Sequence, residues 1–327
     1  MNKDLKICTI GGGSGMPIVN KALIRAGFEN IYPIVTTFDS GGDTGRLRTD
    51  ERGKLLAFSD YWRALISLWD DGKQKEVWEE MLRYRDGRGR NFGNTFFQFL
   101  AEKELNLGEV DQLFSKLTGA KLKGKVIPVS LESSDVCFKT VSNKIYRGEN
   151  NVDELRMSDD KINDIWLEPK VKANPEAIDI MKSADVIILG PGTIYGSVLP
   201  NFLPEGMIKA FTDSKAKKIF MVNIFSPANE TKTATQLEYI KIFEKYLDIK
   251  FPFDLILMAD LNVLNKIYLK KIINFYKLEH ATLVTNMINK DYKAEVVDMA
   301  VIDKKNMRLR HSEKKLERYF RTLQIDK

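Results

Sequence analysis

Short apolar runs alternate with segments of helical periodicity along most of the chain. The runs at residues 5–10, 31–38 and 184–190 are almost continuously apolar, as expected for parallel strands that are covered on both faces. Residues 16–26 follow the first run and repeat apolar positions at helical spacing. Residues 206–260 read as a helix followed by two further strands. This order predicts an α/β fold with a doubly wound, mostly parallel sheet.

Two parts of the chain depart from this alternation. Residues 54–118 are mostly helical in pattern, whereas residues 126–167 alternate apolar and polar positions as strands do. No internal repeat and no low-complexity linker separates them from the rest. The sequence therefore predicts a single domain over residues 1–327, with a helical insertion at about residues 54–118 and a small β region at about residues 126–167.

The charge balance favours a small anionic ligand. The 327 residues include 51 lysines and arginines against 45 aspartates and glutamates, for a net charge of +6. A nucleic-acid binder would concentrate its basic residues in a stripe with interleaved aromatics. Residues 304–320 are locally basic, and we expect them to form a solvated helix. Because no signal pattern and no apolar run of about 18 residues is present, we expect a cytoplasmic protein with neither nucleic acid nor a membrane as partner.

Cysteines and histidines are too few for several kinds of site. Cys8 and Cys137 both lie in apolar, strand-like runs, which predicts buried free thiols in a reducing compartment. The only histidines are His280 and His311, which makes a histidine-rich zinc site or a Ser-His-Asp triad hard to build.

Four glycines stand between the first predicted strand and the first predicted helix. Such a turn brings backbone N–H groups and the positive end of the helix dipole together, and glycine lets a phosphate approach closely. Ser14 would cap the helix and donate its hydroxyl to the ligand. Met16 replaces the third glycine of the dinucleotide-binding pattern. We predict that Gly12, Gly13, Ser14 and Gly15 bind a phosphate or diphosphate, the alternative being a tight turn without a ligand.

A second glycine cluster follows the second predicted strand. Asp39 stands where that strand should end, which is the edge where α/β sheets bind ligands and where an acidic residue can hold a ribose hydroxyl. Asp39 and Asp43 would suit Mg²⁺, and arginines supply forked donors for phosphate. The alternative is a polar surface loop. The predicted ligand residues of this cluster are Asp39, Ser40, Gly41, Gly42, Arg46 and Arg48.

Two more clusters have the same character. Gly93 and Asn94 precede an apolar helical run, so that either Asn94 caps this helix or the helix start faces the same cleft. The apolar strand at residues 184–190 runs into a turn with hydroxyl donors, which we read as a second anion site, the alternative being a structural turn. The predicted ligand residues are Gly190, Gly192, Thr193, Tyr195 and Ser197, together with Asn223 at the end of a later strand.

Taken in order, these motifs resemble the gluconeogenesis-factor branch of the family that includes 2-phospho-L-lactate transferase. The matching stretches are IGGGSG, a strand followed by D-x-GG-x-x-GRLR, G-x-x-x-GN, GPGTIYGSVLPN, and the terminal RHSEKKLERYF. They span essentially the whole chain. The resemblance implies a Rossmann-like fold and a homodimer or larger assembly. It also implies a cleft at the strand C-termini that binds a nucleotide diphosphate: a UDP-sugar, NAD or a GDP-like molecule.

The resemblance implies a different function in each of two branches of the family. A member of the bacterial branch is a regulatory protein that binds UDP-sugars and is linked to central carbon metabolism and cell-shape control. In the transferase branch, a phospho-acid group passes from a nucleotide-activated donor to a deazaflavin with Mg²⁺. We expect the first function and keep the second as the alternative, without assigning a catalytic residue. An NAD-dependent oxidoreductase is a third, weaker interpretation.

One stretch departs from the family pattern. After GRLR, the bacterial branch carries a Pro-Pro-Gly-Asp stretch and an Arg-Asn pair, whereas this chain has KLLAFSDYWRALISL. Asp60 and Arg63 stand near the expected acidic and basic places, and Asn91 occupies a position where small polar residues are common. This departure leaves the exact ligand open.

Overall fold

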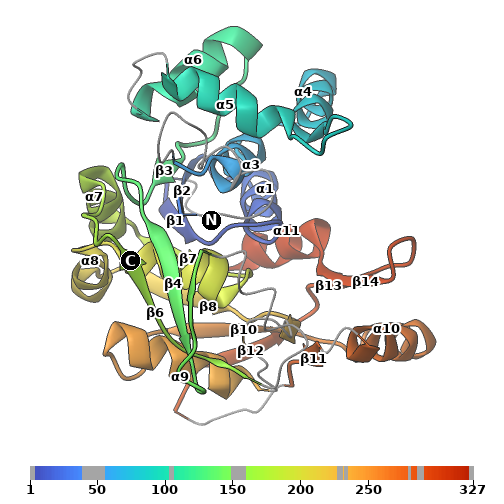
Figure 1. Ribbon diagram of the computed structural model, residues 1–327. Helices are drawn as coiled ribbons and strands as arrows, with labels where there is room; N and C mark the ends of the chain where they lie inside the picture. Colours follow the sequence, from blue (N-terminus) through green and yellow to red (C-terminus); the bar gives the residue numbers. More distant parts are fainter. Residues whose placement is uncertain are drawn as a thin grey trace.

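A seven-stranded parallel sheet crosses the centre of the molecule, in the order β12-β10-β8-β7-β1-β2-β3 (Figure 1). The computed structural model describes residues 4–38, 56–102, 107–148, 160–226, 231, 235–278, 281–285 and 291–323. The sheet strands are β1 (Lys6–Ile10), β2 (Asn30–Val35), β3 (Ile127–Pro128), β7 (Val186–Leu189), β8 (Lys217–Met221), β10 (Leu255–Ala259) and β12 (Ala294–Val297). The predicted doubly wound α/β fold is therefore confirmed.

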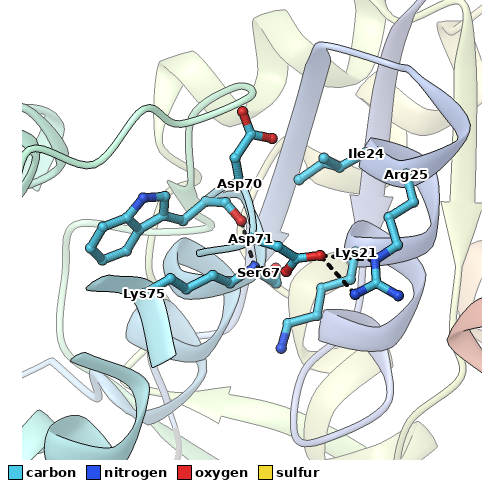
Figure 2. A pocket seen from close by; sticks show the side chains of 8 residues that line it. Lys21, Ile24, Arg25, Ser67, Asp70, Asp71 and Lys75 are labelled. Carbon is cyan, nitrogen blue, oxygen red and sulfur yellow. Dashed lines mark hydrogen bonds and ion pairs between the residues drawn. The ribbon is translucent and has the colours of Figure 1, made fainter. Parts of the chain in front are cut away.

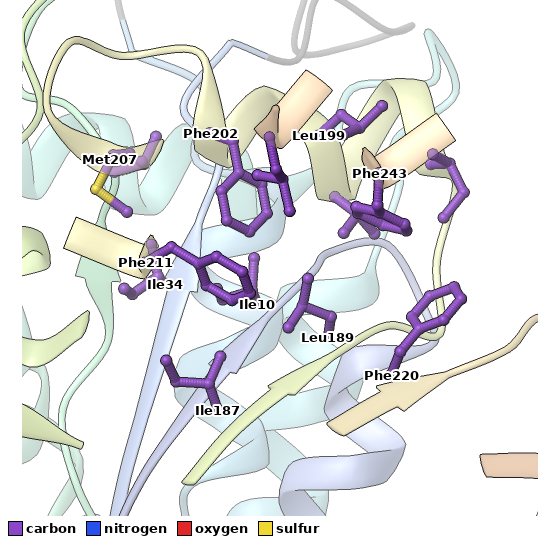
Figure 3. Packing of buried hydrophobic residues seen from close by; sticks show 14 of the residues in the cluster. Ile10, Ile34, Ile187, Leu189, Leu199, Phe202, Met207, Phe211, Phe220 and Phe243 are labelled. Carbon is purple, nitrogen blue, oxygen red and sulfur yellow. The ribbon is translucent and has the colours of Figure 1, made fainter. Parts of the chain in front are cut away.

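The helices cover both faces of this sheet, which explains why its central strands are apolar throughout. The helices are α1 (Met16–Ala26), α3 (Ser59–Ser67), α4 (Lys73–Arg83), α5 (Phe92–Glu102), α6 (Leu107–Thr118), α7 (Pro175–Ser183), α8 (Met207–Asp213), α9 (Gln236–Leu247), α10 (Lys266–Leu278) and α11 (Glu313–Thr322). In β7, Val186 and Ile188 pack with α1, α3 and α11. Ile187 and Leu189 point the opposite way, into the cluster built by α7, α8 and α9 (Figure 3).

The winding direction reverses between β1 and β7. From β1 the chain proceeds to β2 and β3 on one side, whereas β7, β8, β10 and β12 follow one another on the other side. Strands β1 and β7 are direct parallel neighbours, with Ile10 opposite Leu189. In open α/β sheets, the carboxyl ends of the strands at such a reversal form the crevice that binds ligands. The turns that follow β1 and β7 both contain several glycines.

The helical and antiparallel parts lie outside this sheet. Helices α3 to α6 connect β2 to β3 and form the upper part of the molecule in Figure 1. The small antiparallel sheet has the order β5-β4-β6, and β9 pairs with β11 as β13 does with β14. These strands are β4 (Asp135–Thr140), β5 (Ile145–Arg147), β6 (Ile162–Glu168), β9 (Phe225–Ser226), β11 (Thr282–Leu283), β13 (Ala300–Asp303) and β14 (Arg308–His311).

The C-terminal segment differs from the predicted solvated helix. Residues 304–311 belong to the β13–β14 hairpin, and the helix begins only at Glu313, because the Ser312 side chain accepts the N–H of Lys315 as a cap. Leu316 and Phe320 are fully buried where α11 packs along α1. Their four-residue spacing places both on one helical face. The basic residues of this segment therefore lie on two different elements.

Both cysteines are free and buried, as the sequence predicted. Burial raises the pKa of the Cys8 thiol far above its usual range and that of Cys137 to about 11. No helix in the described part of the chain combines the length and apolar character that a membrane span requires.

Candidate functional site

The two glycine turns interlock at the carboxyl ends of β1 and β7. A Cβ built on Gly15 would lie 2.4 Å from the carbonyl oxygen of Pro191, and one on Gly192 would lie 3.6 Å from the carbonyl oxygen of Gly12. The contact at Gly15 requires a residue without a side chain, whereas that at Gly192 is an ordinary van der Waals distance. The structure thus brings together the two predicted anion-binding turns, which are separated by about 175 residues in the sequence.

Asn223 fixes the second turn from the end of β8. Its Nδ2 donates to the carbonyl of Gly192 at 2.7 Å, while its Oδ1 accepts the Gly192 N–H at 3.0 Å. Thr193 and Ser197 share a hydroxyl–hydroxyl hydrogen bond of 2.9 Å. The turn then enters η2 (Ile194–Val198), a π-helical turn, followed by the 3-10 turn η3 (Leu199–Phe202). Three neighbouring strand ends therefore contribute predicted site residues to one place.

The remaining two predicted residues of this turn have packing roles. Gly190 has a φ of +69°, and a Cβ there would lie 2.7 Å from the carbonyl oxygen of Met221. Tyr195 is buried and packs edge-on against Tyr246, with ring centroids 6.2 Å apart. Both residues hold the turn in place from behind.

Asp60 is seated on the first glycine turn. This nearly buried carboxylate on α3 accepts the N–H of Gly13 at 2.7 Å. A Cβ on Gly12 would lie 1.8 Å from its Oδ2, so Gly12 serves the approach of Asp60. Arg63 Nη1 lies 3.5 Å from the same carboxylate. The Gly13 N–H is therefore already hydrogen-bonded to a carboxylate of the chain itself.

The start of α1 leaves amide groups available beside this carboxylate. Gly15 occupies the N-cap in a helical conformation (φ −79°, ψ −56°) without a side-chain hydrogen bond, so the prediction that Ser14 caps the helix is wrong. The cap falls one residue later, on Gly15, which has no side-chain oxygen to accept a first-turn N–H. Ser14 is exposed. Pro17 has no N–H, and the Ile18 N–H donates to the Gly15 carbonyl at 3.1 Å. The amides that this helix start can offer to an anion are therefore those of Ser14, Gly15 and Met16, where the helix dipole favours negative charge.

A hollow of about 210 Å³ opens beside Gly13 and Ser14. It lies between the start of α1, helices α3 and α4, and the β14–α11 junction. Four of the lining residues are cationic and two are acidic, which gives the wall a net positive charge. The lining residues are Gly13, Ser14, Pro17, Ile18, Lys21, Trp62, Arg63, Ile66, Glu79, Arg83, Arg310 and Glu313.

The acidic residue Glu79 is shared between two of these cations. Lys21 Nζ lies 3.3 Å and Arg83 Nη2 2.7 Å from its carboxylate. Burial alone would raise the pKa of Glu79, but the hydrogen bond from Arg83 and the charge of Lys21 outweigh it and lower the pKa. Arg310 makes a looser ion pair, with Nε 3.7 Å from Asp303 Oδ2. The hollow therefore keeps cationic capacity for an anionic ligand.

A second, smaller hollow of about 140 Å³ lies further along α1. Figure 2 shows Arg25 and Asp71 of its wall turned toward one another. Arg25 Nη2 and Asp71 Oδ2 are 2.7 Å apart, and Lys75 Nζ contacts Asp71 at 3.1 Å and the Trp69 carbonyl at 2.5 Å. Because these charged and polar groups pair with one another, we assign no ligand to this second hollow.

Gly93 and Asn94 support the first hollow from behind. The Oδ1 of Asn94 accepts the indole N–H of Trp62 at 2.9 Å. A Cβ on Gly93 would lie 2.7 Å from the carbonyl oxygen of Leu82 and 3.1 Å from the Trp62 ring. The helix cap is Asn91, whose Oδ1 accepts the Asn94 N–H at 3.0 Å, so the alternative that Asn94 itself caps α5 is wrong. The pair positions Trp62, which lines the hollow.

The second glycine cluster lies outside the described residues. This applies to Asp39, Ser40, Gly41, Gly42, Asp43, Arg46 and Arg48. Among the residues that are described, no group of three or more His, Cys, Asp or Glu side chains could hold a metal ion. The assignment of Mg²⁺ to Asp39 and Asp43 stays a prediction.

Among the four cations of the hollow, the sequence indicated Arg63 but not the other three. Lys21, Arg83 and Arg310 come from three elements far apart along the chain, and none stands in a glycine-rich motif. Arg310 precedes His311, whose pKa burial lowers to about 4. The only available signal was the RHSEKKLERYF stretch within the family resemblance.

Comparison with known proteins gives a consistent result. Residues 7–286 match the family model described as 2-phospho-L-lactate transferase CofD. A putative gluconeogenesis factor of Aquifex aeolicus is 34% identical over 255 residues, 76% of each chain. The gluconeogenesis factor of Listeria innocua is 31% identical over 252 residues, 75% of each chain, and that of Bacillus subtilis is 26% identical over 322 residues, 97% of each.

The fold has a close match among solved structures. A crystal structure of a Bacillus halodurans protein superposes with a TM-score of 0.81 at 23% sequence identity. The superposition covers 97% of this chain and 99% of that one. At this identity the likeness concerns the arrangement of the chain.

Proposed function

The chain belongs to the CofD family and, within it, to the gluconeogenesis factors, and from this we propose that it is a regulatory protein that binds a UDP-sugar. Binding would control its part in central carbon metabolism and cell shape. The observation that carries the proposal is the cationic hollow beside the start of α1, whose wall includes Gly13 and Ser14 of the first glycine turn. The residues of the second turn hold the first turn from behind and do not line this hollow.

The geometry supports a diphosphate in a particular place. Since Asp60 already accepts the Gly13 N–H, phosphate oxygens would use the amides of Ser14, Gly15 and Met16, at the positive end of the α1 dipole. Lys21 and Arg310, which line the same hollow, would neutralise the remaining charge. Arginine is suited to this because its planar fork of donors matches phosphate oxygens.

The described lining groups are suited to binding. Glycine amides, a serine hydroxyl, lysine and arginine hold and neutralise an anion. The choice of a uridine nucleotide carrying a sugar rests on the family resemblance. A transferase reaction would place Mg²⁺ on Asp39 and Asp43, which lie outside the described residues.

Titration calorimetry tests the proposal with UDP-N-acetylglucosamine, UDP-glucose and NAD, each with and without Mg²⁺. We expect saturable binding of a UDP-sugar, recovered chemically unchanged, and at least tenfold weaker binding by Arg310→Gln, equivalent to about 1.4 kcal/mol. The matched control is Arg318→Gln on α11, an exposed arginine outside the hollow.

Three results would overturn parts of this proposal. No binding of any UDP-sugar removes the ligand class, and equal affinity of Arg310→Gln and the wild type removes the hollow as the site. Release of a nucleoside monophosphate when an acceptor is supplied would establish the transferase instead.

For the regulatory role, a Bacillus subtilis strain lacking its own gluconeogenesis factor should regain growth on gluconeogenic carbon sources with the wild-type chain and fail to do so with Arg310→Gln.

A further inference from the structure

The positive charge of this chain is concentrated in one projecting part of the molecule. Residues 261–278 contain four lysines and no acidic residue, and residues 300–310 contain two lysines, two arginines and one aspartate. Together they carry +7, against +6 for the whole chain. The remainder of the sequence is therefore close to neutral. Helix α10 and the β13–β14 hairpin, which hold these residues, project together on one side of the molecule (Figure 1).

Aromatic contacts join the helix and the hairpin into one surface. Lys304 of the hairpin lies 4.5 Å from the centroid of the Tyr268 ring on α10, and Arg308 lies 5.4 Å from that of Phe275. Tyr276 stacks on Phe225 at 3.9 Å, which anchors the helix to the body of the protein. We call this joint surface the basic arm, defined as residues 261–278 and 300–310.

The basic arm also carries the two most exposed large apolar side chains in the described part of the chain. Leu278 is 80% and Ile267 69% exposed, and Val263 nearby is 53% exposed. Along α10 only Ile272 is buried. Exposed aliphatic side chains among lysines, with no acidic residue on the helix, are typical of a helix that lies in the interface of an anionic membrane.

We propose that the basic arm binds the surface of an anionic lipid bilayer. The lysines and arginines would approach the negatively charged headgroups, while Ile267 and Leu278 enter the boundary between headgroups and acyl chains. This surface revises the expectation that a membrane is not a partner, which rested on the absence of a spanning segment. The exposed apolar residues favour a membrane over a nucleic acid, because phosphate backbones need only the charges. The proposal does not depend on the nucleotide ligand.

Vesicle co-sedimentation tests the proposal with the full chain. The probes are vesicles of equal parts phosphatidylglycerol and phosphatidylcholine, compared with phosphatidylcholine alone. We expect binding to the anionic vesicles only, weakened by added salt. Two variants should each reduce it at least tenfold: Ile267→Ser with Leu278→Ser, and Lys266→Gln with Lys270→Gln and Lys277→Gln.

Matched controls separate the basic arm from general surface effects. Val77→Ser with Met81→Ser removes exposed apolar side chains from α4, and the triple change to Gln at Lys170, Lys172 and Lys182 removes exposed lysines elsewhere. Both controls should bind as the wild type does. The single variant Leu278→Ser, at the exposed end of α10, serves if the double variant does not fold.

Two outcomes would overturn the proposal. One is equal sedimentation, or none, with both kinds of vesicle. The other is equal binding of the wild type and the apolar variants to anionic vesicles, together with equally strong binding to a short DNA duplex of random sequence. That result would make the basic arm a general polyanion-binding surface.

Discussion

The contact between the two glycine turns can be tested at a residue whose own backbone favours alanine. Gly15 has helical angles, so that Gly15→Ala by itself should stabilise the protein by about 0.5–1 kcal/mol. Its new Cβ, however, would lie 2.4 Å from the Pro191 carbonyl oxygen, whereas ordinary contacts begin at 3.4 Å. The turns must separate by about 1 Å, and overpacking of this kind costs about 1–3 kcal/mol.

The expected net result is a loss of about 1–2 kcal/mol in the free energy of unfolding. Because the separation displaces the amides at the start of α1, affinity for the nucleotide should fall at least tenfold. Urea unfolding measures the first quantity and titration calorimetry the second. Gly87→Ala is the matched control, since a Cβ there meets no atom within 4 Å, and it should change neither quantity appreciably.

A stability gain in Gly15→Ala, with unchanged nucleotide affinity, would refute the reasoning. That outcome would mean that helix propensity alone governs the site and that the turns do not touch in solution. A stability loss without any change in affinity would support the contact between the turns but would show that the first turn is not part of the ligand site.

Three further predictions follow from individual contacts. Asn223→Ala removes two hydrogen bonds to Gly192 and should lower the free energy of unfolding by about 1–3 kcal/mol in urea titrations, whereas Asn223→Asp would keep one acceptor. Asp60→Asn should strengthen metal-free binding of an anionic ligand several-fold in calorimetry, because it removes a negative charge beside the site. Weaker binding would show that the Asp60 charge helps to hold the ligand. Burial raises the pKa of Asp111 from 3.8 to about 6 despite its hydrogen bond from Tyr61. The folded state therefore binds the proton more tightly, and stability relative to Asp111→Asn should fall by up to about 3 kcal/mol as the pH rises from 4 to 7. A pH-independent difference between the two proteins would contradict this.

The central sheet was predictable because its signals are local. The apolar runs of β1 and β7 and the periodicity of α1 are contained within a few residues each, and α1 has the predicted bounds, Met16–Ala26. The C-terminal segment was not, since its division at Ser312 depends on a hairpin that forms with β13, several residues upstream. Local pattern gives the elements, but pairing partners decide where a basic, weakly apolar segment changes from strand to helix.

The candidate site divides in the same way. Glycines at strand ends can be recognised in the sequence, because three consecutive glycines are seldom found except where the backbone must turn tightly or be closely approached. The cations of the hollow cannot, because Lys21, Arg83 and Arg310 are ordinary surface residue types until the fold gathers them. For Gly93 and Asn94, the alternative of a cap at Asn94 is wrong, and their place in a ligand site stays a prediction. A polar helix start can face a cleft or a neighbouring indole, and only tertiary contacts distinguish the two.

The stretch that departs from the family pattern lies where a change of ligand would be made. Its helix, α3, brings Asp60 onto the first glycine turn and places Trp62, Arg63 and Ile66 in the wall of the hollow. The first glycine turn, which contributes Gly13 and Ser14 to this wall, keeps the IGGGSG sequence on which the family resemblance rests. An anion-binding turn of the family sequence beside an altered wall would retain the diphosphate and change what is attached to it. We therefore expect this chain to differ from its relatives in the sugar or base that it prefers, rather than in the diphosphate it holds. Exchanging residues 56–67 for the corresponding stretch of the Bacillus subtilis protein should alter the ranking of UDP-sugars in calorimetry, and an unchanged ranking would place ligand choice elsewhere.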